Sequence, residues 1–393
     1  MDSIPTLPTS RSSLLEVPPL VRRLQTKGPI HRVRTAVGDE GWLVTGHAEL
    51  RELMGDSRMG RSHPDPESAS RVSESALIGG AADNFDTEPE DAAKLRSRLQ
   101  PLFSAKRMRL LRGHVDDLVT ELLDTMEKQG SPADLHQALA LPLPILVICE
   151  LLGVPYADRA DFREWSQQAG TVSDRAQSYA GIQKLFGYIH GLIERKRREP
   201  GEDVLSALCQ AEDGTIPDEE IARLGAVLLF AGHETTVTRI GYGTVLLLAN
   251  PDQRDLLLTD PDLLSKAIEE ILRSQSKGGG TLPRYARTDI EIGGVVIKSG
   301  DLVILDTGAG NHDVGVFTDP DRFDVSRKGN THLGFGHGMH YCIGAPLARI
   351  ELQAVFGQLL PRFPKLRLDV GLDRLEFDDD QLTKGLKALP VAW

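Results

Sequence analysis

A cysteine, Cys342, lies in a segment of the sequence that is rich in glycine. Four glycines occur within eleven positions here, at Gly334, Gly336, Gly338 and Gly344. Glycine lets a backbone turn tightly and approach another group closely. A helix is predicted just after the cysteine, and the positive end of its dipole would favour a thiolate. The pattern therefore predicts a soft or redox-active metal ligand, and the alternative is a buried structural cysteine beside a glycine turn.

A second set of reactive side chains interrupts an apolar helix predicted over residues 227–239. It includes His233, Glu234 and Thr235, although carboxylates and hydroxyls disfavour the interior of such a helix. A local preference broken in a core helix indicates a functional site. The alternative is a kinked helix whose threonine hydroxyls bond back to helix carbonyls. A zinc-hydrolase site is excluded, because the helical metal pair would need a histidine at Val237.

A third pattern, Glu270 and Arg273, places opposite charges on one face of a predicted helix. By itself the pair is a weak signal, because exposed pairs at this spacing contribute little. A dinucleotide-binding reading of Gly308 and Gly310 fails because the sixth position is Asp313. A structural zinc site fails too, since the histidines near the cysteine lack paired ligand spacing.

The elements that must position these residues are mostly helical. Apolar residues recur at three- and four-residue spacing from about 90 to 275. Residues 1–30 are predicted to be an irregular arm and residues 60–90 a long loop. Other elements are expected as follows: strands at 31–34 and 41–45, a strand at 289–297, a turn at 298–300, a strand at 301–305, and a helix at 346–360. The predicted fold class is mainly α with small β-sheets.

The composition is that of an ordinary globular protein. The 393 residues are 40% hydrophobic, and the net charge of −12 argues against general nucleic-acid binding. Three cysteines do not make a disulfide framework, so a reducing, cytoplasmic location is expected. No signal peptide or membrane span is recognisable. Since no linker or repeat divides the chain, residues 1–393 are predicted to form a single domain.

Taken together, the order and spacing of these motifs resemble the cytochrome P-450 family, the haem-thiolate monooxygenases, and most of all its soluble bacterial branch. The resemblance covers essentially the whole chain. It rests on these matches: Phe335, Gly336, Gly338, His340, Cys342 and Gly344 in the glycine loop; Ala231, Gly232, Glu234, Thr235 and Thr236 in the helix; Glu270 and Arg273; Asp319 to Phe323; and Leu389 to Val391. One departure is Ala92, where the family often has a histidine that meets a haem propionate.

The resemblance implies one large α-rich fold around haem b, with the following roles. Cys342 would be the axial iron ligand, and His340, Arg284 and Arg96 would pair with the propionates. The remaining cofactor contacts would come from Gly232, Phe335, Gly336 and Gly344. Glu234 and Thr235 would lie over the other haem face and relay protons, with Gly232 keeping the helix open for dioxygen. Glu270 and Arg273 would form a buried structural pair, with Arg322 close by.

The implied activity is insertion of one oxygen atom from O2 into a small hydrophobic substrate. The substrate would be a natural-product intermediate of secondary metabolism, such as a polyketide, macrolide, terpenoid or cyclic peptide. Substrate contacts are expected at residues 60–90, 165–190, 227–239, 277–284 and 383–385. The alternatives are a peroxide-driven or oxidative-coupling haem enzyme, and a non-catalytic haem-binding sensor. The Glu234-Thr235 pair favours oxygen activation, since the others have no use for a proton relay.

Electrons are expected from a ferredoxin and its reductase, with NAD(P)H as the ultimate donor to a monomeric enzyme. Between Lys94 and Arg112 the sequence holds seven cations and no acid. A basic patch on an acidic protein would steer an acidic ferredoxin to that face. Charge reversal at Arg98, Lys106 or Arg109 is expected to slow reduction by the ferredoxin and to leave peroxide-driven turnover intact.

Overall fold

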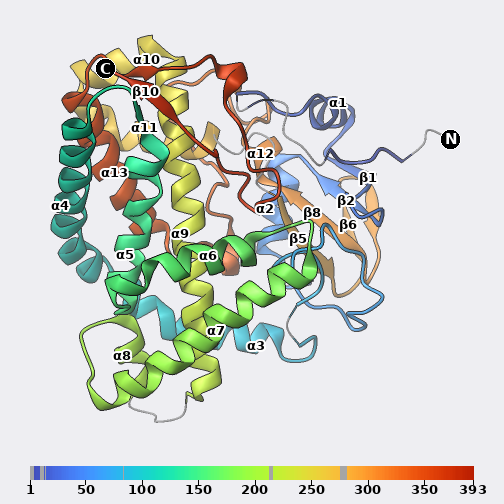
Figure 1. Cartoon of the computed structure of the whole chain (residues 1–393). Helices are drawn as coiled ribbons and strands as arrows, with labels where there is room; N and C mark the ends of the chain where they lie inside the picture. The colour runs from blue at the N-terminus through green and yellow to red at the C-terminus, as the bar shows by residue number, and fades with distance from the viewer. Residues whose placement is uncertain (1–3, 9–12, 14, 83, 212–215, 275–280) are drawn as a thin grey trace. The chain divides into compact units, whose positions relative to one another are not determined.

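The computed structural model describes residues 4–8, 13, 15–82, 84–211, 216–274 and 281–393 (Figure 1). The chain divides into two compact units. Unit 1 comprises Met1–Ser97 and Tyr242–Ala345, and unit 2 comprises Arg98–Gly241 and Pro346–Trp393. Helices account for most of the described chain and the sheets are small, which confirms the predicted fold class.

Unit 1 is built around a five-stranded sheet with the order β1-β2-β8-β5-β3. These strands are β1 (Ile30–Arg34), β2 (Glu40–Val44), β3 (Met59–Gly60), β5 (Thr281–Ala286) and β8 (Leu302–Asp306). β8 runs parallel to β2 and antiparallel to β5, and α2 (His47–Gly55) packs its buried Leu50 and Leu53 into the core of this unit. The other helices are α1 (Pro19–Lys27), α3 (Glu88–Leu99, which runs into unit 2), α10 (Pro251–Thr259), α11 (Leu264–Ser274) and α12 (Thr307–Gly310).

The segment 289–297, predicted as one strand, is a hairpin of two strands. β6 (Ile290–Ile292) pairs antiparallel with β7 (Val295–Ile297). The turn between them is Gly293-Gly294, with φ of +55° and +78°. Two consecutive positive φ angles characterise the tight turns that join antiparallel strands, and glycine adopts them without strain. The predicted turn before β8 is present, but β8 joins the five-stranded sheet instead of pairing with the preceding strand.

The N-terminal segment is a second correction, because residues 19–27 of the expected irregular arm form helix α1. The segment contains two consecutive prolines, Pro18 and Pro19, and proline is well tolerated in the first turn of a helix. Val21 and Leu24 are buried, and Gly28 ends the helix by donating its N–H to the Leu24 carbonyl oxygen. One amphipathic face therefore holds the segment against the unit.

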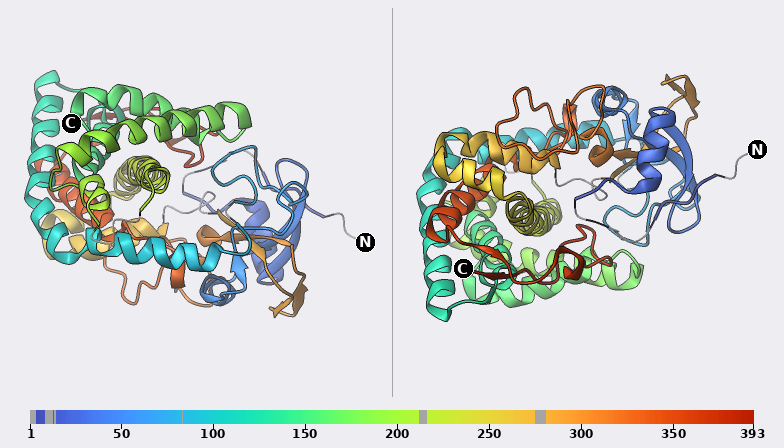
Figure 2. Two further views of the ribbon diagram at one scale, coloured as in Figure 1. Left: turned by 90° about the horizontal axis from the view of Figure 1, so that it is seen from below. Right: turned by 90° about the horizontal axis from the view of Figure 1, so that it is seen from above.

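Unit 2 is largely helical. Its helices are α4 (Ala105–Gln129), α5 (Pro142–Leu152), α6 (Arg159–Gly170), α7 (Arg175–Arg198), α8 (Val204–Cys209), most of α9 (Asp218–Ala249) and α13 (Ala345–Arg362), with a π-helical turn at His136–Ala140. A small sheet of β4 (Ala133–Asp134), β10 (Pro390–Ala392) and β9 (Arg367–Leu368) completes it. Figure 2 looks along α9 and shows the red C-terminal tail between it and the green helices α6 and α7. None of the described helices combines the length and apolar character that a membrane span requires.

Candidate active site

The loop that carries Cys342 is held in place by its own backbone. The Cys342 N–H donates to the Phe335 carbonyl oxygen at 2.9 Å, which closes the loop. Gly336 and Gly338 have φ of +73° and +69°, a conformation that other residues rarely adopt. At Gly338 a side chain would also collide with α2, since its Cβ would lie 2.7 Å from the Met54 carbonyl oxygen. The glycines thus set the path of the loop, and the Cys342 side chain is exposed at its end, just before α13 begins at Ala345.

Cations gather around His340 in unit 1. The pKa of His340 is lowered, first by burial and then by repulsion from Arg284, Arg61 and Arg96. Glu88 acts in the opposite direction and only partly offsets these charges. The charges of Arg284 and Arg96, which the resemblance assigns to the propionates together with His340, thus act on His340, and so does that of Arg61, which no motif indicates. Such a cluster of like charges is suited to binding an anionic group.

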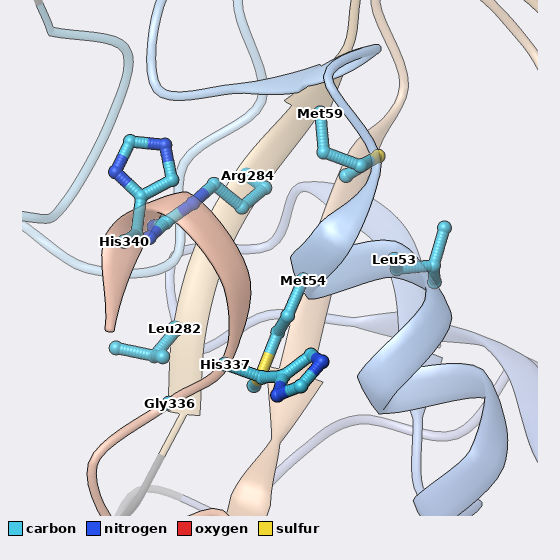
Figure 3. Close-up of a pocket in the computed structure, with 8 residues that line it drawn as sticks. All are labelled: Leu53, Met54, Met59, Leu282, Arg284, Gly336, His337 and His340. Atoms are coloured by element: carbon cyan, nitrogen blue, oxygen red, sulfur yellow. The ribbon is translucent and has the colours of Figure 1, made fainter. Parts of the chain in front are cut away.

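Arg96 and Arg284 reach this cluster from different elements. From α3, Arg96 Nη1 donates to the carbonyl oxygens of Met339 and Tyr341, at 3.2 and 2.7 Å, and so also braces the cysteine loop. From β5, Arg284 extends toward the loop that carries His340 (Figure 3). Arg96 is thus hydrogen-bonded to the loop, and Arg284 lines a pocket together with loop residues.

A small pocket lies between α2, β3, β5 and this loop. Its lining residues are Leu53, Met54, Met59, Leu282, Arg284, Gly336, His337 and His340 (Figure 3). Apolar side chains come from α2, β3 and the start of β5, and the basic ones from β5 and the loop. His337 was not selected from the sequence as a site residue, although it stands within the glycine motif.

The donor set of unit 1 fits the haem group that the resemblance implies. A sulfur donor on a rigid loop suits a soft or redox-active metal. Permanent cations in the same unit suit the two carboxylates of a porphyrin. The exposed Cys342 side chain and the arginines near His340 therefore satisfy both requirements.

The pair Glu270 and Arg273 is fully buried in unit 1, with both side chains 0% exposed. Arg273 Nε and Nη2 each donate to a Glu270 carboxylate oxygen at 2.8 Å. The guanidinium also donates to carbonyl oxygens, among them that of Arg322. The second cation on Glu270 comes from Arg327 Nε, at 3.1 Å, and not from the Arg322 side chain. Sequence spacing identified the pair but missed Arg327, which is 57 positions away.

Helix α9 is unbroken around the second motif, and its threonines are bonded back to the helix. Thr235 Oγ1 donates to the Ala231 carbonyl oxygen at 2.8 Å, and Thr238 Oγ1 donates to the Glu234 carbonyl oxygen at 3.2 Å. At Gly232 an added Cβ would lie 2.7 Å from Ile148 Cδ1 of α5. Gly232 therefore lets α5 approach α9, and its effect on access to dioxygen stays a prediction.

Glu234 has the electrostatics of a group that exchanges protons near neutral pH. Its side chain is 13% exposed. Burial and the nearby Asp378 raise its pKa to about 7, although Arg163 and a hydrogen bond from Thr383 act to lower it. The neighbouring His233 is buried, and burial lowers its pKa to about 3, so its imidazole is neutral. Glu234 is thus the group of this motif that titrates at physiological pH.

One face of α9 in unit 2 is exposed although the helix is otherwise mostly buried. Val227 is 51% exposed, and Ala231 and Thr235 are exposed at successive four-residue steps. Residues at this spacing lie on one side of a helix. The stripe is apolar except for the Thr235 hydroxyl, so it offers a contact surface for a largely hydrophobic ligand.

The basic stretch from Lys94 to Arg112 is less uniform than its sequence. Arg98 forms an ion pair with Glu220 and is only 13% exposed, so it is a poor choice for a docking test. Arg112 pairs with Asp116 at 3.0 Å. Lys106 and Arg109 on α4 are exposed, as expected. Of the expected substrate contacts, those at 277–280 lie outside the described residues.

Comparisons with known proteins agree on one family. The sequence model described as Cytochrome P450 matches residues 172–370. The chain is 43% identical over 401 residues to pentalenolactone synthase of Streptomyces exfoliatus, covering 100% of both chains. It is 40% identical over 377 residues to mycinamicin IV hydroxylase/epoxidase of Micromonospora griseorubida, covering 94% of each. A substrate-free cytochrome P450 structure, the epoxidase of the polyene macrolide antibiotic pimaricin, matches with a TM-score of 0.90 and 42% identity, covering 100% of both chains.

Proposed function

The chain belongs to the cytochrome P450 family and is a P450-type monooxygenase, and on this premise we propose that it inserts one oxygen atom from O2 into a small hydrophobic natural-product intermediate. Candidate classes are polyketides, macrolides, terpenoids and cyclic peptides. Support comes from relatives named for pentalenolactone and mycinamicin IV, and from the pimaricin epoxidase. The exposed apolar stripe of α9 also suits such a substrate.

The observation that carries this proposal is the cysteine loop with its surrounding cations. We propose that the Cys342 sulfur would hold the iron of haem b, with Phe335, Gly336 and Gly344 shaping the loop that carries it. His340, Arg284 and Arg96 are assigned to the propionates, and Arg61 joins them as a further cation near His340. When bound, haem with a thiolate ligand supplies the reductive activation of O2 and cleavage of the O–O bond, as is known for this family. The protein supplies the sulfur, the charges and the protons.

Proton delivery is assigned to Glu234 and Thr235. Because the pKa of Glu234 is about 7, its carboxylate can take up a proton from solvent and release it again at neutral pH. Thr235 lies on the exposed face of α9, where its Oγ1 can accept one hydrogen bond while it donates another. Proton delivery of this kind requires a titrating acid beside a hydroxyl group, and a peroxide-driven enzyme or a haem sensor would need neither.

We further propose that a ferredoxin and its reductase deliver the electrons from NAD(P)H. The exposed Lys106 and Arg109 on α4 provide cations for an acidic partner in a chain of net charge −12. The protein is proposed to act as a cytoplasmic monomer, with residues 1–393 as a single haem-binding domain.

The test of the haem assignment is the carbon-monoxide difference spectrum of the reduced protein. We expect the thiolate-type band to disappear in Cys342→Ala and to persist in Cys149→Ala and Cys209→Ala. Burial raises the pKa of the Cys149 thiol to about 12 and also raises that of Cys209, so neither is a thiolate at neutral pH. A normal band in Cys342→Ala would refute the assignment.

A further inference from the structure

The segment that leads into the cysteine loop, residues 330–334, is anchored to helix α11 by side chains of unit 1. His332 Nε2 lies 3.0 Å from Glu269 Oε2. Two residues earlier, Asn330 Nδ2 donates to Glu270 Oε2 at 3.2 Å. Consecutive glutamates of α11 therefore hold this segment, although 63 and 60 positions separate the partners in the sequence.

The other ring nitrogen of His332 holds the backbone of the loop. The Gly334 N–H donates to His332 Nδ1 at 3.0 Å. Because Nδ1 accepts this bond, the ring proton lies on Nε2, from which it is donated to Glu269. The His332 side chain is 4% exposed, and hydrogen bonds shielded from water in this way are stronger. A single tautomer of the imidazole thus makes both bonds.

Gly334 fits closely between this imidazole and α11. A Cβ at Gly334 would lie 3.0 Å from His332 Nδ1 and 3.0 Å from the Leu272 carbonyl oxygen. The ring of the next residue, Phe335, has its centroid 6.0 Å from that of the imidazole, and the Phe335 carbonyl oxygen accepts the N–H of Cys342. A continuous series of contacts and bonds therefore runs from α11 to the backbone amide of Cys342.

Other anchors of this segment lie before the loop. The Leu333 N–H donates to Asn311 Oδ1 at 2.7 Å, and His47 Nε2 donates to the Thr331 carbonyl oxygen at 3.0 Å. The bond to His332 Nδ1, by contrast, is made by the first glycine of the loop. Loss of the imidazole should therefore loosen the loop while the residues before it stay in place.

We propose that His332 and Glu269 are positioning residues for the Cys342 sulfur. Glu269 fixes the tautomer and orientation of the imidazole, and the imidazole fixes the path of the loop at Gly334. Groups behind a metal ligand that fix its orientation affect both metal affinity and the electronic properties of the ligand. This inference rests on the proposed role of Cys342 as the ligand of haem iron.

Three substitutions separate the two bonds of His332. His332→Asn keeps an acceptor for the Gly334 N–H, because an asparagine oxygen bonds the backbone two residues on, but its side chain is too short to reach Glu269. His332→Gln carries an amide donor toward Glu269 and has no acceptor at the place of Nδ1. His332→Leu makes neither bond.

The first experiment measures amide hydrogen exchange in the haem-loaded chain. Exchange at Gly334 and Cys342 should be about tenfold faster in His332→Leu than in the parent, because a buried hydrogen bond is lost. His332→Asn should restore most of the protection, and His332→Gln should restore less. Amides of the central strand β8 serve as the internal reference and should be unaffected. An equal increase in β8 would show a general loss of stability and would overturn the proposal.

The second experiment is the carbon-monoxide difference spectrum of the reduced protein, which reports the sulfur ligand. Part of the thiolate-type band should be lost in His332→Leu, and also in Glu269→Ala, where the imidazole loses the acceptor that fixes its tautomer. The matched control is His31→Leu. His31 Nε2 also bonds a backbone carbonyl in unit 1, that of Gly28 at 2.8 Å, but it lies on β1. This control should leave both measurements unchanged.

The rescue by asparagine separates positioning from a merely structural role. If His332→Leu matches the parent in both measurements, or if His332→Asn is no better than His332→Leu, the proposal is overturned. A thiolate-type band that persists in Cys342→Ala would instead reject the haem assignment on which the proposal rests. Loss of that band in Cys342→Ala, together with bands like that of the parent in every His332 variant, would reject this inference alone.

Discussion

Glu270 in unit 1 and Glu234 in unit 2 are both buried glutamates in helices, yet their surroundings differ completely. Glu270 is 0% exposed and accepts hydrogen bonds from Arg273, Arg327, Asn330 and a backbone N–H. Glu234 is 13% exposed, and burial and the charge of Asp378 raise its pKa. The partners of Glu270 are hydrogen-bond donors, two of them guanidinium groups, whereas burial and the charge of Asp378 raise the pKa of Glu234 to about 7.

The difference lies in the kind of charged group that surrounds each site. Around Glu270, and around the cysteine loop with Arg96 and Arg284, the charges are largely guanidinium groups that do not exchange protons at neutral pH. Around Glu234, burial and a like charge bring a carboxyl group into the range where it titrates. Burial alone therefore does not decide the role of a glutamate, since the neighbouring charges do.

The largest expected effect is the loss of stability when Glu270 loses one of its arginine partners. Arg273→Ala leaves the Glu270 carboxylate buried without its bidentate partner, and should destabilise the protein by about 3–5 kcal/mol. Arg327 is 10% exposed and leaves Arg273 in place, so Arg327→Ala should cost about 1–2 kcal/mol. Urea unfolding followed by circular dichroism measures both. Equal losses of stability in the two variants would contradict the expectation that Arg273 contributes more to the stability of the protein than Arg327 does.

The next effect depends on pH and concerns Glu234. Because its pKa is raised from 4.5 to about 7 in the folded protein, the folded state holds a proton more tightly than the unfolded state. Stability from this group is complete below pH 4.5 and is lost as the pH rises through about 7. The Glu234→Gln variant has no carboxyl group to ionise at this position, so it keeps this stability as the pH rises. Above pH 7 the variant should therefore be more stable than the parent, by up to about 3 kcal/mol.

The measurement for Glu234 is the urea midpoint of parent and variant across this pH range. The two curves should meet at acid pH and diverge as the pH rises. Parallel curves would show that the Glu234 carboxyl is not the titrating group, and would remove the contrast with Glu270.

The smallest expected effect tests whether the packing of α9 is independent of its acid. Gly232→Ala places a methyl group 2.7 Å from Ile148 Cδ1, which must move. The crowding outweighs the gain from replacing a helical glycine, so the net loss should be about 1 kcal/mol. Ile148→Val in the same chain should recover stability by removing that atom. An infrared titration of the Glu234 carboxyl should be the same in the parent and in both variants, and a shift would show that this packing affects the proton affinity of Glu234.

Several features could be predicted from the sequence because they depend on residues close together in the chain. The glycines around Cys342 set a local backbone path, and the three-residue spacing of Glu270 and Arg273 places them on one helical face. The order of these motifs also identified the family and the mainly α fold. Two local signals were misread: Pro18-Pro19 begins a helix, and Gly293-Gly294 makes a hairpin turn.

Other features were decided only by the tertiary structure. Arg61 near His340, Arg327 on Glu270, and Asp378 and Thr383 beside Glu234 are all distant in sequence from the group they act on. No spacing rule predicts such approaches, because a coulombic interaction depends on separation in space and on burial. The sequence by itself therefore determined which residues could do chemistry. Folding determined which of those charges stay fixed and which carboxyl group holds a proton near neutral pH.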